Sequence, residues 1–133
     1  MNEGKMEYSD DSVAGLLPLR EPTFYILLSL SAGSKHGYAI LKDVADLSNG
    51  TVKLSTGTLY EALARLLEQS LIERADLPES TENIAASEKD HPGRPRKTYR
   101  LSKKGKTLLK LETNRLQALI TAANQRLGSE TAG

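Results

Sequence analysis

The chain is organised around VKLSTGTLY at Val52–Tyr60, which continues as EALARLLEQ at residues 61–69. Four leucines in this stretch recur at the spacing of one helical face: Leu59, Leu63, Leu66 and Leu67. Ser55 is a good N-cap residue, although Thr58 stands where a full capping box would have Glu or Gln. The stretch therefore predicts a short extended entry followed by an amphipathic helix over residues 55–69.

The opposite face of this predicted helix is polar, and its side chains are small near the start. It carries Thr56, Gly57, Tyr60, Glu61, Ala64, Arg65 and Glu68. Small residues let another backbone approach closely, and hydroxyl groups can hydrogen-bond to it. Because most amphipathic helices only support a fold, the meaning of this surface depends on the rest of the chain.

Length and composition set broad limits on the class of protein. At 133 residues, with 38% hydrophobic and 26% charged residues, the chain fits one folded globular domain. It has no cysteine, which excludes disulfides, thiolate metal sites and thiol nucleophiles, and His36 and His91 lack a metal-binding spacing. No apolar run is long enough to span a membrane and no signal peptide opens the chain. We therefore expect a cytoplasmic protein with no metal and no cofactor.

Residues 1–20 are predicted to form an N-terminal extension. Its first dozen residues are acidic and predicted to be disordered, and three leucines are candidates for docking onto the domain: Leu16, Leu17 and Leu19. Pro22 suits the first turn of a helix, which Ala32-Gly33-Ser34 then ends. The apolar residues of this helix make it central to the core: Phe24, Ile26, Leu27, Leu28 and Leu30.

A second helix is predicted over Gly37–Ser48. One face of it carries Tyr38, Leu41, Val44 and Ala45, and Asn49-Gly50 is a clear terminator. Thr51–Leu54, between this helix and the one that follows, is predicted to be a small strand.

After residue 70 the pattern becomes extended and then helical again. Leu71–Leu77 fits a strand, residues 78–95 form an acidic and then turn-rich loop, and Lys97–Leu101 fits a returning antiparallel strand with Tyr99 and Leu101 on one face. The two strands and their long loop predict a wing.

A long terminal helix is predicted from Ser102 to Leu127, with Gly128 as its stop signal. An apolar seam runs along it, containing Leu108, Leu109, Leu116, Leu119, Ile120, Ala123 and Leu127. A small domain cannot cover a stripe of this length, so we expect a partner helix and a homodimer.

Charge is concentrated around the wing, although the net charge is only +1. Between residues 94 and 110 no acid interrupts the basic series Arg94, Arg96, Lys97, Arg100, Lys103, Lys104, Lys106 and Lys110. Such a block can neutralise phosphates, and Arg94-Pro-Arg96 could enter a minor groove. A solvated helix face is the alternative interpretation for Lys103, Lys104 and Lys106.

The order of the predicted elements is that of a winged helix-turn-helix, a mainly α fold with a small β-wing. We predict an extension over residues 1–20, the winged domain over 21–101, a dimerisation helix over 102–128 and a tail over 129–133. In this fold the third helix lies in the major groove and the wing contacts the flanking backbone.

The candidate DNA-binding residues lie at the start of the third helix and in the wing. They are Ser55, Thr56, Gly57, Thr58, Tyr60, Arg65, Arg94, Arg96 and Lys97. For Arg65 two interpretations stay open: contact with a base edge or phosphate, or an ion pair with Glu61 or Glu68. The candidate dimerisation residues are Leu109, Leu116, Leu119, Ile120, Ala123 and Leu127.

Several motifs at these spacings closely resemble the PadR family of transcriptional regulators. They are Gly37-Tyr38-x-Ile40, Leu54-Ser-x-Gly57-Thr58-Leu59-Tyr60-x-x-Leu63-x-x-Leu66, Leu71-Ile72 and Tyr99-x-Leu101-Ser102-x-x-Gly105, within residues 22–110. The resemblance implies a winged helix-turn-helix with a C-terminal dimerisation helix that binds palindromic operator DNA, usually as a repressor. On matching positions it implies recognition-helix roles for Ser55, Thr56, Gly57 and Tyr60, and wing roles for Arg94, Arg96 and Lys97.

The chain departs from the family pattern in two places. Gln69-Ser70 replaces a glycine that often precedes the Leu-Ile pair, which should alter only the turn, and the first half of the wing loop is long and acidic. Some family members resemble sensors of phenolic acids or hydrophobic drugs. With no tryptophan and one phenylalanine, this chain gives little support for an aromatic-lined pocket, so a small-molecule effector remains an unidentified partner without assigned residues.

Four further residues are predicted to have structural roles and no role in binding. Tyr25 and Tyr38 are predicted to be core residues, Gly37 a helix-packing requirement, and His36 a surface residue near a helix start.

Two other functions stay open beside a dimeric DNA-binding regulator. One is a winged-helix module that binds proteins without specific DNA binding; steep loss of DNA affinity with salt would argue against it. The other is an enzyme, for which the sequence offers no paired carboxylates, phosphate-cradling loop, metal cluster or recognisable base near Ser55 or Ser102.

Overall fold

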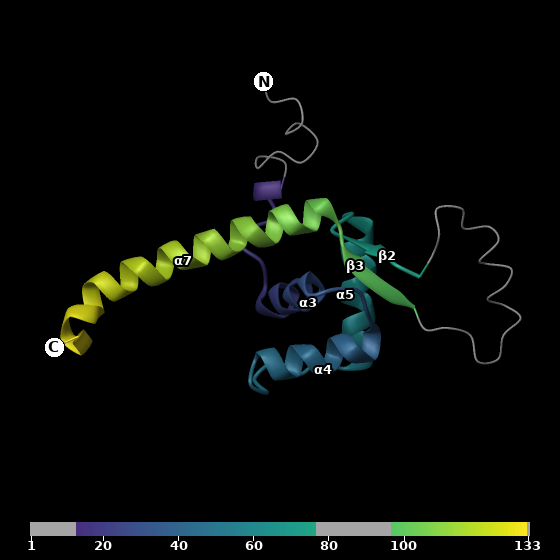
Figure 1. Cartoon of the computed structure of the whole chain (residues 1–133), viewed down its shortest axis with the longest axis horizontal. Helices are drawn as coiled ribbons and strands as arrows, with labels where there is room; N and C mark the ends of the chain where they lie inside the picture. Colours follow the sequence, from purple (N-terminus) through teal and green to yellow (C-terminus); the bar gives the residue numbers. More distant parts are fainter. Residues whose placement is uncertain (1–12, 77–96, 133) are drawn as a thin grey trace, which may run out of the picture.

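The computed structural model describes residues 13–76 and 97–132, with side chains up to residue 128 (Figure 1). The elements are α3 (Glu21–Ser31), β1 (Lys35–His36), α4 (Gly37–Leu47), α5 (Thr56–Glu68), β2 (Ile72–Arg74), β3 (Thr98–Leu101) and α7 (Lys103–Ala132). This mainly helical chain with one small antiparallel sheet is a winged helix-turn-helix, as predicted. The predicted disorder of the first dozen residues and the loop at 78–95 lie outside the described residues.

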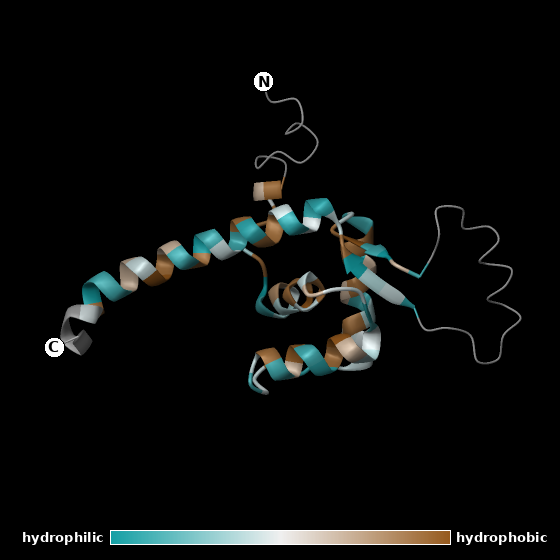
Figure 2. Cartoon of the chain, in the orientation of Figure 1, coloured by the Kyte–Doolittle hydropathy of each residue, from teal (hydrophilic) through white to brown (hydrophobic). Residues whose placement is uncertain are grey.

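Helix α3 lies beneath the first half of α7 and supplies the centre of the core (Figure 1). Pro22 occupies the first turn, where its missing N–H removes no helical hydrogen bond. Ile26, Leu27 and Leu30 are buried, which confirms the predicted role of this helix. Figure 2 shows hydrophobic residues along α3 and on parts of α4, α5 and the first half of α7.

Helix α4 ends as its Asn-Gly terminator predicts. Asn49 and Gly50 have φ angles of 54° and 80°, in the left-handed region. The Gly50 N–H donates to the Ala45 carbonyl at 2.7 Å and the Asn49 N–H to the Asp46 carbonyl at 3.1 Å. This is a Schellman motif, in which two late N–H groups satisfy carbonyls of the last helical turn.

Helix α5 also ends with a Schellman motif, but one without a glycine. Ser70 adopts a φ of 62°. Its N–H donates to the Leu67 carbonyl at 3.0 Å, and the Leu71 N–H donates to the Leu66 carbonyl at 2.9 Å. The Ser102 hydroxyl donates to the Ser70 carbonyl at 2.6 Å, which ties this turn to the start of α7. Replacing the family's glycine therefore leaves the turn intact, at the cost of a strained serine.

The predicted strand at Thr51–Leu54 is wrong. Within the described residues, the third strand is β1, which pairs antiparallel with β3 through Lys35–Tyr99 and His36–Thr98. Residues 51–54 instead follow a local turn, in which the Val52 N–H donates to the Ser48 hydroxyl at 2.9 Å. Among the described strands, the pairing of β3 with β1 and β2 leaves residues 51–54 outside the sheet.

The wing strands pair as predicted, in the register Ile72–Leu101, Glu73–Arg100 and Arg74–Tyr99. β2 is shorter than the predicted Leu71–Leu77, although the Ala75 N–H still donates to the Thr98 carbonyl at 2.8 Å. Tyr99 and Leu101 share the buried face of β3, as the alternation of the sequence indicates.

Helix α7 does not stop at Gly128, contrary to the prediction, but continues to Ala132. Its first half packs on the domain, where Leu108 is fully buried. The N-terminal segment packs beside it: Val13 is buried, and the three predicted docking leucines contact the core. Within the described residues, no helix is long and apolar enough to cross a membrane.

Candidate nucleic-acid interface

The start of α5 is closed by its own side chains. The Ser55 hydroxyl oxygen accepts the Thr58 N–H at 3.1 Å, which confirms the predicted N-cap. The same hydroxyl donates to the Thr58 side-chain oxygen at 2.9 Å, whereas the Glu or Gln of a capping box would accept the backbone N–H of the N-cap residue. Both residues are exposed. Their mutual bonds fix the direction in which the first turn faces solvent.

The outer surface of that first turn is open. Thr56 and Gly57 are exposed, and a Cβ placed on Gly57 would have no atom within 4 Å. Leu59 and Leu63 point the other way, into the core. The leucine stripe therefore holds α5 down while its small N-terminal residues remain accessible to another backbone.

Tyr60 joins the starts of α4 and α5. It is 41% exposed, and its hydroxyl and ring lie so close to Gly37 that a Cβ there would collide with them. Gly37 is the first residue of α4, and its lack of a side chain lets the Tyr60 ring pack against this helix start, in line with the predicted packing role. Tyr60 thus has two roles. Its ring packs the start of α5 against the start of α4, and the rest of its surface stays accessible to solvent.

Tyr38 is 66% exposed, so the prediction that it is a core residue is wrong. Ile40 and Val44, one helical turn apart, define the buried face of α4. Tyr38 lies two residues before Ile40, and so points to the opposite side. It is a candidate surface residue that the sequence argument missed, although the Ile40–Val44 spacing already contained the signal.

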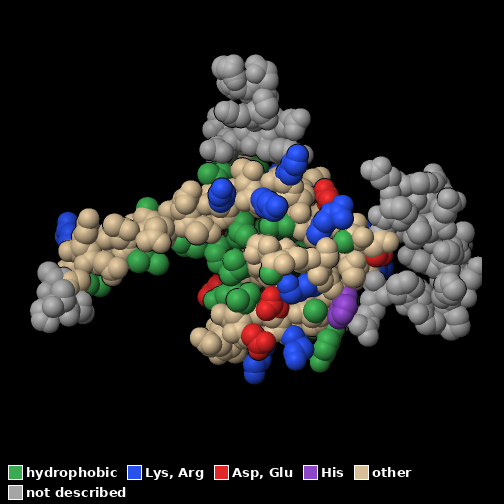
Figure 3. Space-filling view, in the orientation of Figure 1, with side chains coloured by type: hydrophobic (Ala, Val, Ile, Leu, Met, Phe, Trp, Pro, Cys, Tyr) green, Lys and Arg blue, Asp and Glu red, His purple; other side chains and the backbone are tan. Residues whose placement is uncertain are grey.

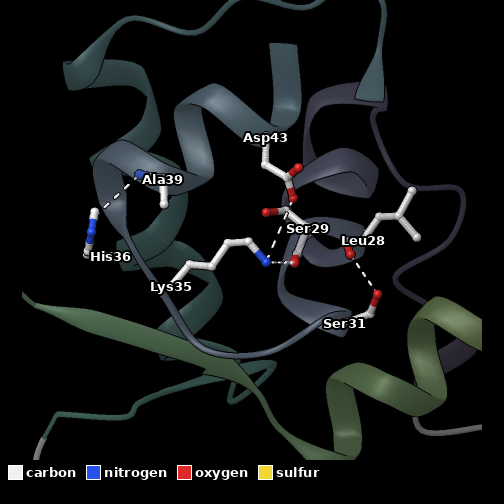
Figure 4. A network of polar contacts seen from close by, with 7 residues as sticks. All are labelled: Leu28, Ser29, Ser31, Lys35, His36, Ala39 and Asp43. Carbon is white, nitrogen blue, oxygen red and sulfur yellow. Dashed lines mark hydrogen bonds and ion pairs between the residues drawn. The ribbon is translucent and has the colours of Figure 1, made fainter. Parts of the chain in front are cut away.

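The connection between α3 and α4 is fixed by polar contacts around β1 (Figure 4). The Lys35 ammonium donates to the Ser29 carbonyl at 2.7 Å and lies 3.8 Å from an Asp43 carboxylate oxygen. His36 Nδ1 accepts the Ala39 N–H at 3.4 Å and caps α4. His36 is half-buried and structural. These contacts set the position of α4 against α3, and hence that of Gly37 beneath Tyr60.

The base of the wing is held by Asp76. Its carboxylate accepts two bonds from the Arg74 guanidinium, at 2.7 and 2.6 Å, and the Thr98 N–H at 3.2 Å. The hydrogen bonds from Arg74 hold the pKa of the Asp76 carboxyl below its ordinary value. Burial raises the pKa of the Tyr99 hydroxyl on the neighbouring strand. Arg74 is therefore a structural residue of the wing.

The basic series continues from the wing into α7. Lys97, Lys103, Lys106 and Lys110 are exposed. The Arg100 guanidinium bonds Glu73 at 3.0 Å, and the Lys104 ammonium donates to the Gln69 carbonyl at 3.0 Å. Arg94 and Arg96 lie outside the described residues. Figure 3 shows Lys and Arg side chains gathered over the first half of α7.

Arg65 lies away from the other candidate residues of α5. It lines a cavity with the N-terminal segment, near the C-terminal end of the helix. Among the described residues it forms no ion pair with Glu61 or Glu68, which removes one of its two predicted interpretations. Nor do the described residues contain a cluster of three His, Cys, Asp or Glu residues that could hold a metal ion.

The sequence matches the model of the transcriptional regulator PadR-like family over residues 26–111, which include all of α4, α5 and the wing strands. The chain belongs to this family. The comparison with curated proteins gave no match.

Solved structures share the fold. A PadR family transcription regulator from Clostridium difficile is 25% identical, with a TM-score of 0.60, over 81% of this chain and 99% of that one. A PadR-like transcriptional regulator from Bacillus cereus is 24% identical, with a TM-score of 0.57, over 88% and 96%. A transcriptional regulator from Clostridium thermocellum is 22% identical, with a TM-score of 0.57, over 88% and 95%. Family and fold together identify a DNA-binding transcriptional regulator.

Proposed function

We propose that this PadR-like chain is a homodimeric repressor that binds a palindromic operator. The start of α5 enters the major groove, and the basic wing contacts the flanking phosphates. The proposal includes no enzymatic activity and no cofactor.

The observation that carries the proposal is the open first turn of α5. Thr56 and Gly57 are exposed, no described atom lies within 4 Å of a Cβ placed on Gly57, and Tyr60 is 41% exposed. A helix start with small residues and free N–H groups can approach a phosphate or base edge closely. Ser55 and Thr58, the other two candidate residues of this turn, support the surface through the cap that they form.

Charge supports the role of the wing. Lys97 is exposed directly before β3 and follows Arg94 and Arg96 in the sequence. Exposed lysines continue along the first half of α7. Each phosphate that a lysine or arginine neutralises releases counterions, so binding should weaken steeply with salt.

The homodimer is supported by the free apolar stripe of α7. Leu119, Ile120 and Leu127 are 55%, 53% and 60% exposed, and they continue the line of the buried Leu109 along the helix. Figure 3 shows exposed hydrophobic side chains along the overhang, which is the second half of α7 that extends beyond the domain. A second copy of the chain would cover the stripe, together with Leu116 and Ala123. A two-fold dimer reads two half-sites, and the operator is then palindromic.

Selection of bound duplexes from a random pool, at physiological salt, tests the proposal directly. The expected result is a palindrome whose half-sites are separated by one helical turn or a multiple of it. A folded dimer that recovers no preferred sequence would instead support the protein-interaction module. Repression is then tested with a reporter promoter carrying the recovered site, whose activity should fall when the protein is expressed.

Variants distinguish contacts to base edges from contacts to phosphates. Thr56→Ala should relax the preference at one base pair, by about 1–3 kcal/mol. Lys97→Gln should weaken binding to all sequences equally and reduce the salt slope by about 1. Arg126→Gln, the same charge change at the exposed end of α7, should leave both quantities unchanged.

A further inference from the structure

A cavity of about 250 Å³ lies at the end of α5 that is remote from the open first turn. It is bordered by the N-terminal segment, the first turn of α3, the C-terminal part of α5 and the residue before β2, and it is open to solvent on one side. Its apolar walls are Leu16, Pro18, Leu19, Ala62, Leu66 and Leu71, and its polar members are Arg20, Thr23, Arg65 and Gln69. The described lining thus contains two positive charges and no carboxylate.

Both arginines of the cavity lack a carboxylate partner among the described residues. Glu21 follows Arg20 directly, and Glu61 and Glu68 share the helix of Arg65, yet none of them forms an ion pair with either guanidinium. Three other arginines do bond carboxylates: Arg74, Arg100 and Arg115. Both arginines are exposed, and neither guanidinium donates a hydrogen bond to another residue in the part of the chain that the structure describes.

We propose that this cavity binds a small anion, a phosphate or a small carboxylate, between Arg20 and Arg65. Guanidinium groups offer planar pairs of N–H donors that match the oxygen pairs of carboxylates and phosphates. Thr23 and Gln69 add a hydroxyl and an amide to the same lining. The volume is below the 300–1,000 Å³ typical of sites for drug-sized ligands, so the occupant has only a few heavy atoms.

The place of the cavity connects the anion to two functional parts of the molecule. Arg65 belongs to α5, the proposed recognition helix. Leu19, another wall residue, donates its N–H to a Glu112 carboxylate oxygen on α7 at 3.0 Å. A bound anion would therefore contact both the recognition helix and the segment that is attached to α7. Arg65 would hold this anion instead of contacting a base edge.

Titration of inorganic phosphate into the full chain tests the site, with ionic strength held constant by sodium chloride. Calorimetry should show saturable binding, and phosphate should raise the melting temperature. Arg20→Gln and Arg65→Gln should each weaken phosphate binding by about tenfold or more, since each removes a charge-assisted pair of hydrogen bonds. Arg126→Gln removes the same charge from an exposed position far along α7 and should leave the affinity unchanged.

Two outcomes would overturn the site: no saturable binding, or an equal loss of affinity in Arg126→Gln. Should Arg65→Gln fail to fold, Arg65→Lys tests the same contact, because it keeps the charge and removes the planar fork. That variant should bind phosphate several-fold more weakly than the parent.

A second titration distinguishes two sources of phosphate. It repeats the measurement on protein bound to a duplex. An unchanged affinity assigns the site to a free anion, whereas competition assigns it to a backbone phosphate of DNA. The first titration contains no DNA, so failure of the proposed operator binding would leave the anion site standing.

Discussion

The two halves of α7 have the same apolar stripe but opposite environments. In the first half Gly105, Leu108 and Leu109 are buried against the domain. A Cβ at Gly105 would collide with the Leu71 carbonyl, which shows how closely the helix packs there. In the second half Ile120 and Leu127 are more than half exposed. The first half is thus packed on the winged domain, and the second leaves its apolar residues exposed in the single chain.

The largest effect is expected in the buried half. Leu108→Ala should lower the free energy of unfolding by about 2–5 kcal/mol, because it removes a fully buried side chain and leaves a cavity. Ile120→Ala, in the exposed half, should change it by less than about 1 kcal/mol at protein concentrations where the chain is monomeric. Urea unfolding of both variants measures the difference. Equal losses would mean that the overhang belongs to the folded core.

A charge in the exposed half should act on assembly instead of folding. Ile120→Glu places a carboxylate in the stripe, where a partner helix would bury it without a counter-charge. We expect the dimer dissociation constant to rise by at least about tenfold with an unchanged monomer fold. Sedimentation equilibrium measures it. Gln125→Glu adds the same charge to the opposite face of the helix and serves as the control; an unaltered dimer in Ile120→Glu would place the interface elsewhere.

The same comparison divides the candidate dimerisation residues into buried and exposed ones. Leu109 is only 8% exposed within one chain, so the domain already covers it. Leu116 is half-buried at the junction of the two halves. Periodicity placed all the seam residues on one face, but it carries no information about where the domain ends beneath the helix. The remaining exposed residues of the seam stay the candidates for a dimer contact.

What the sequence predicted well depends on short-range interactions. The leucine stripe and Ser55 define α5 from residues within two turns, and the alternation around Tyr99 defines β3. What it missed depends on distant partners. β1 is a strand only because the edge of β3 lies beside it, and the burial of Glu112 requires the N–H of Leu19, which is 93 residues away in the sequence.

Glu112 provides a third, pH-dependent test within the buried half. Its carboxylate is 1% exposed, accepts the Leu19 N–H, and bonds the Arg115 guanidinium at 2.6 and 3.0 Å. The Arg115 bonds hold the pKa of the Glu112 carboxyl below its ordinary value in the folded chain. Its contribution to stability is therefore present above the ordinary carboxyl pKa, and is lost as pH falls through the depressed one.

Glu112→Gln should accordingly lower the free energy of unfolding at neutral pH by about 1–3 kcal/mol, and the difference from the parent should shrink in acid. Urea unfolding across the acid range measures this. Glu73→Gln breaks the exposed pair with Arg100, whose side chains are both 51% exposed, and should cost less than about 1 kcal/mol. A Glu112→Gln deficit that stays constant with pH would assign its effect to shape instead of charge.

The smallest effect concerns the glycine that failed to end the helix. A glycine inside a helix costs only about 1 kcal/mol relative to alanine, which is too little to stop α7. Gly128→Ala should stabilise the overhang by at most that amount, because among the described residues the new Cβ would meet only the Asn124 Cβ, at 3.7 Å. Gly105→Ala, in the buried half, should instead destabilise the chain by about 1–3 kcal/mol through its collision with the Leu71 carbonyl. Circular dichroism and thermal unfolding of both variants compare them. Stability changes of opposite sign for the two Gly→Ala substitutions would follow from close packing in the first half of α7 and open space in the second. Stabilisation by both substitutions would mean that the first half is not tightly packed on β2.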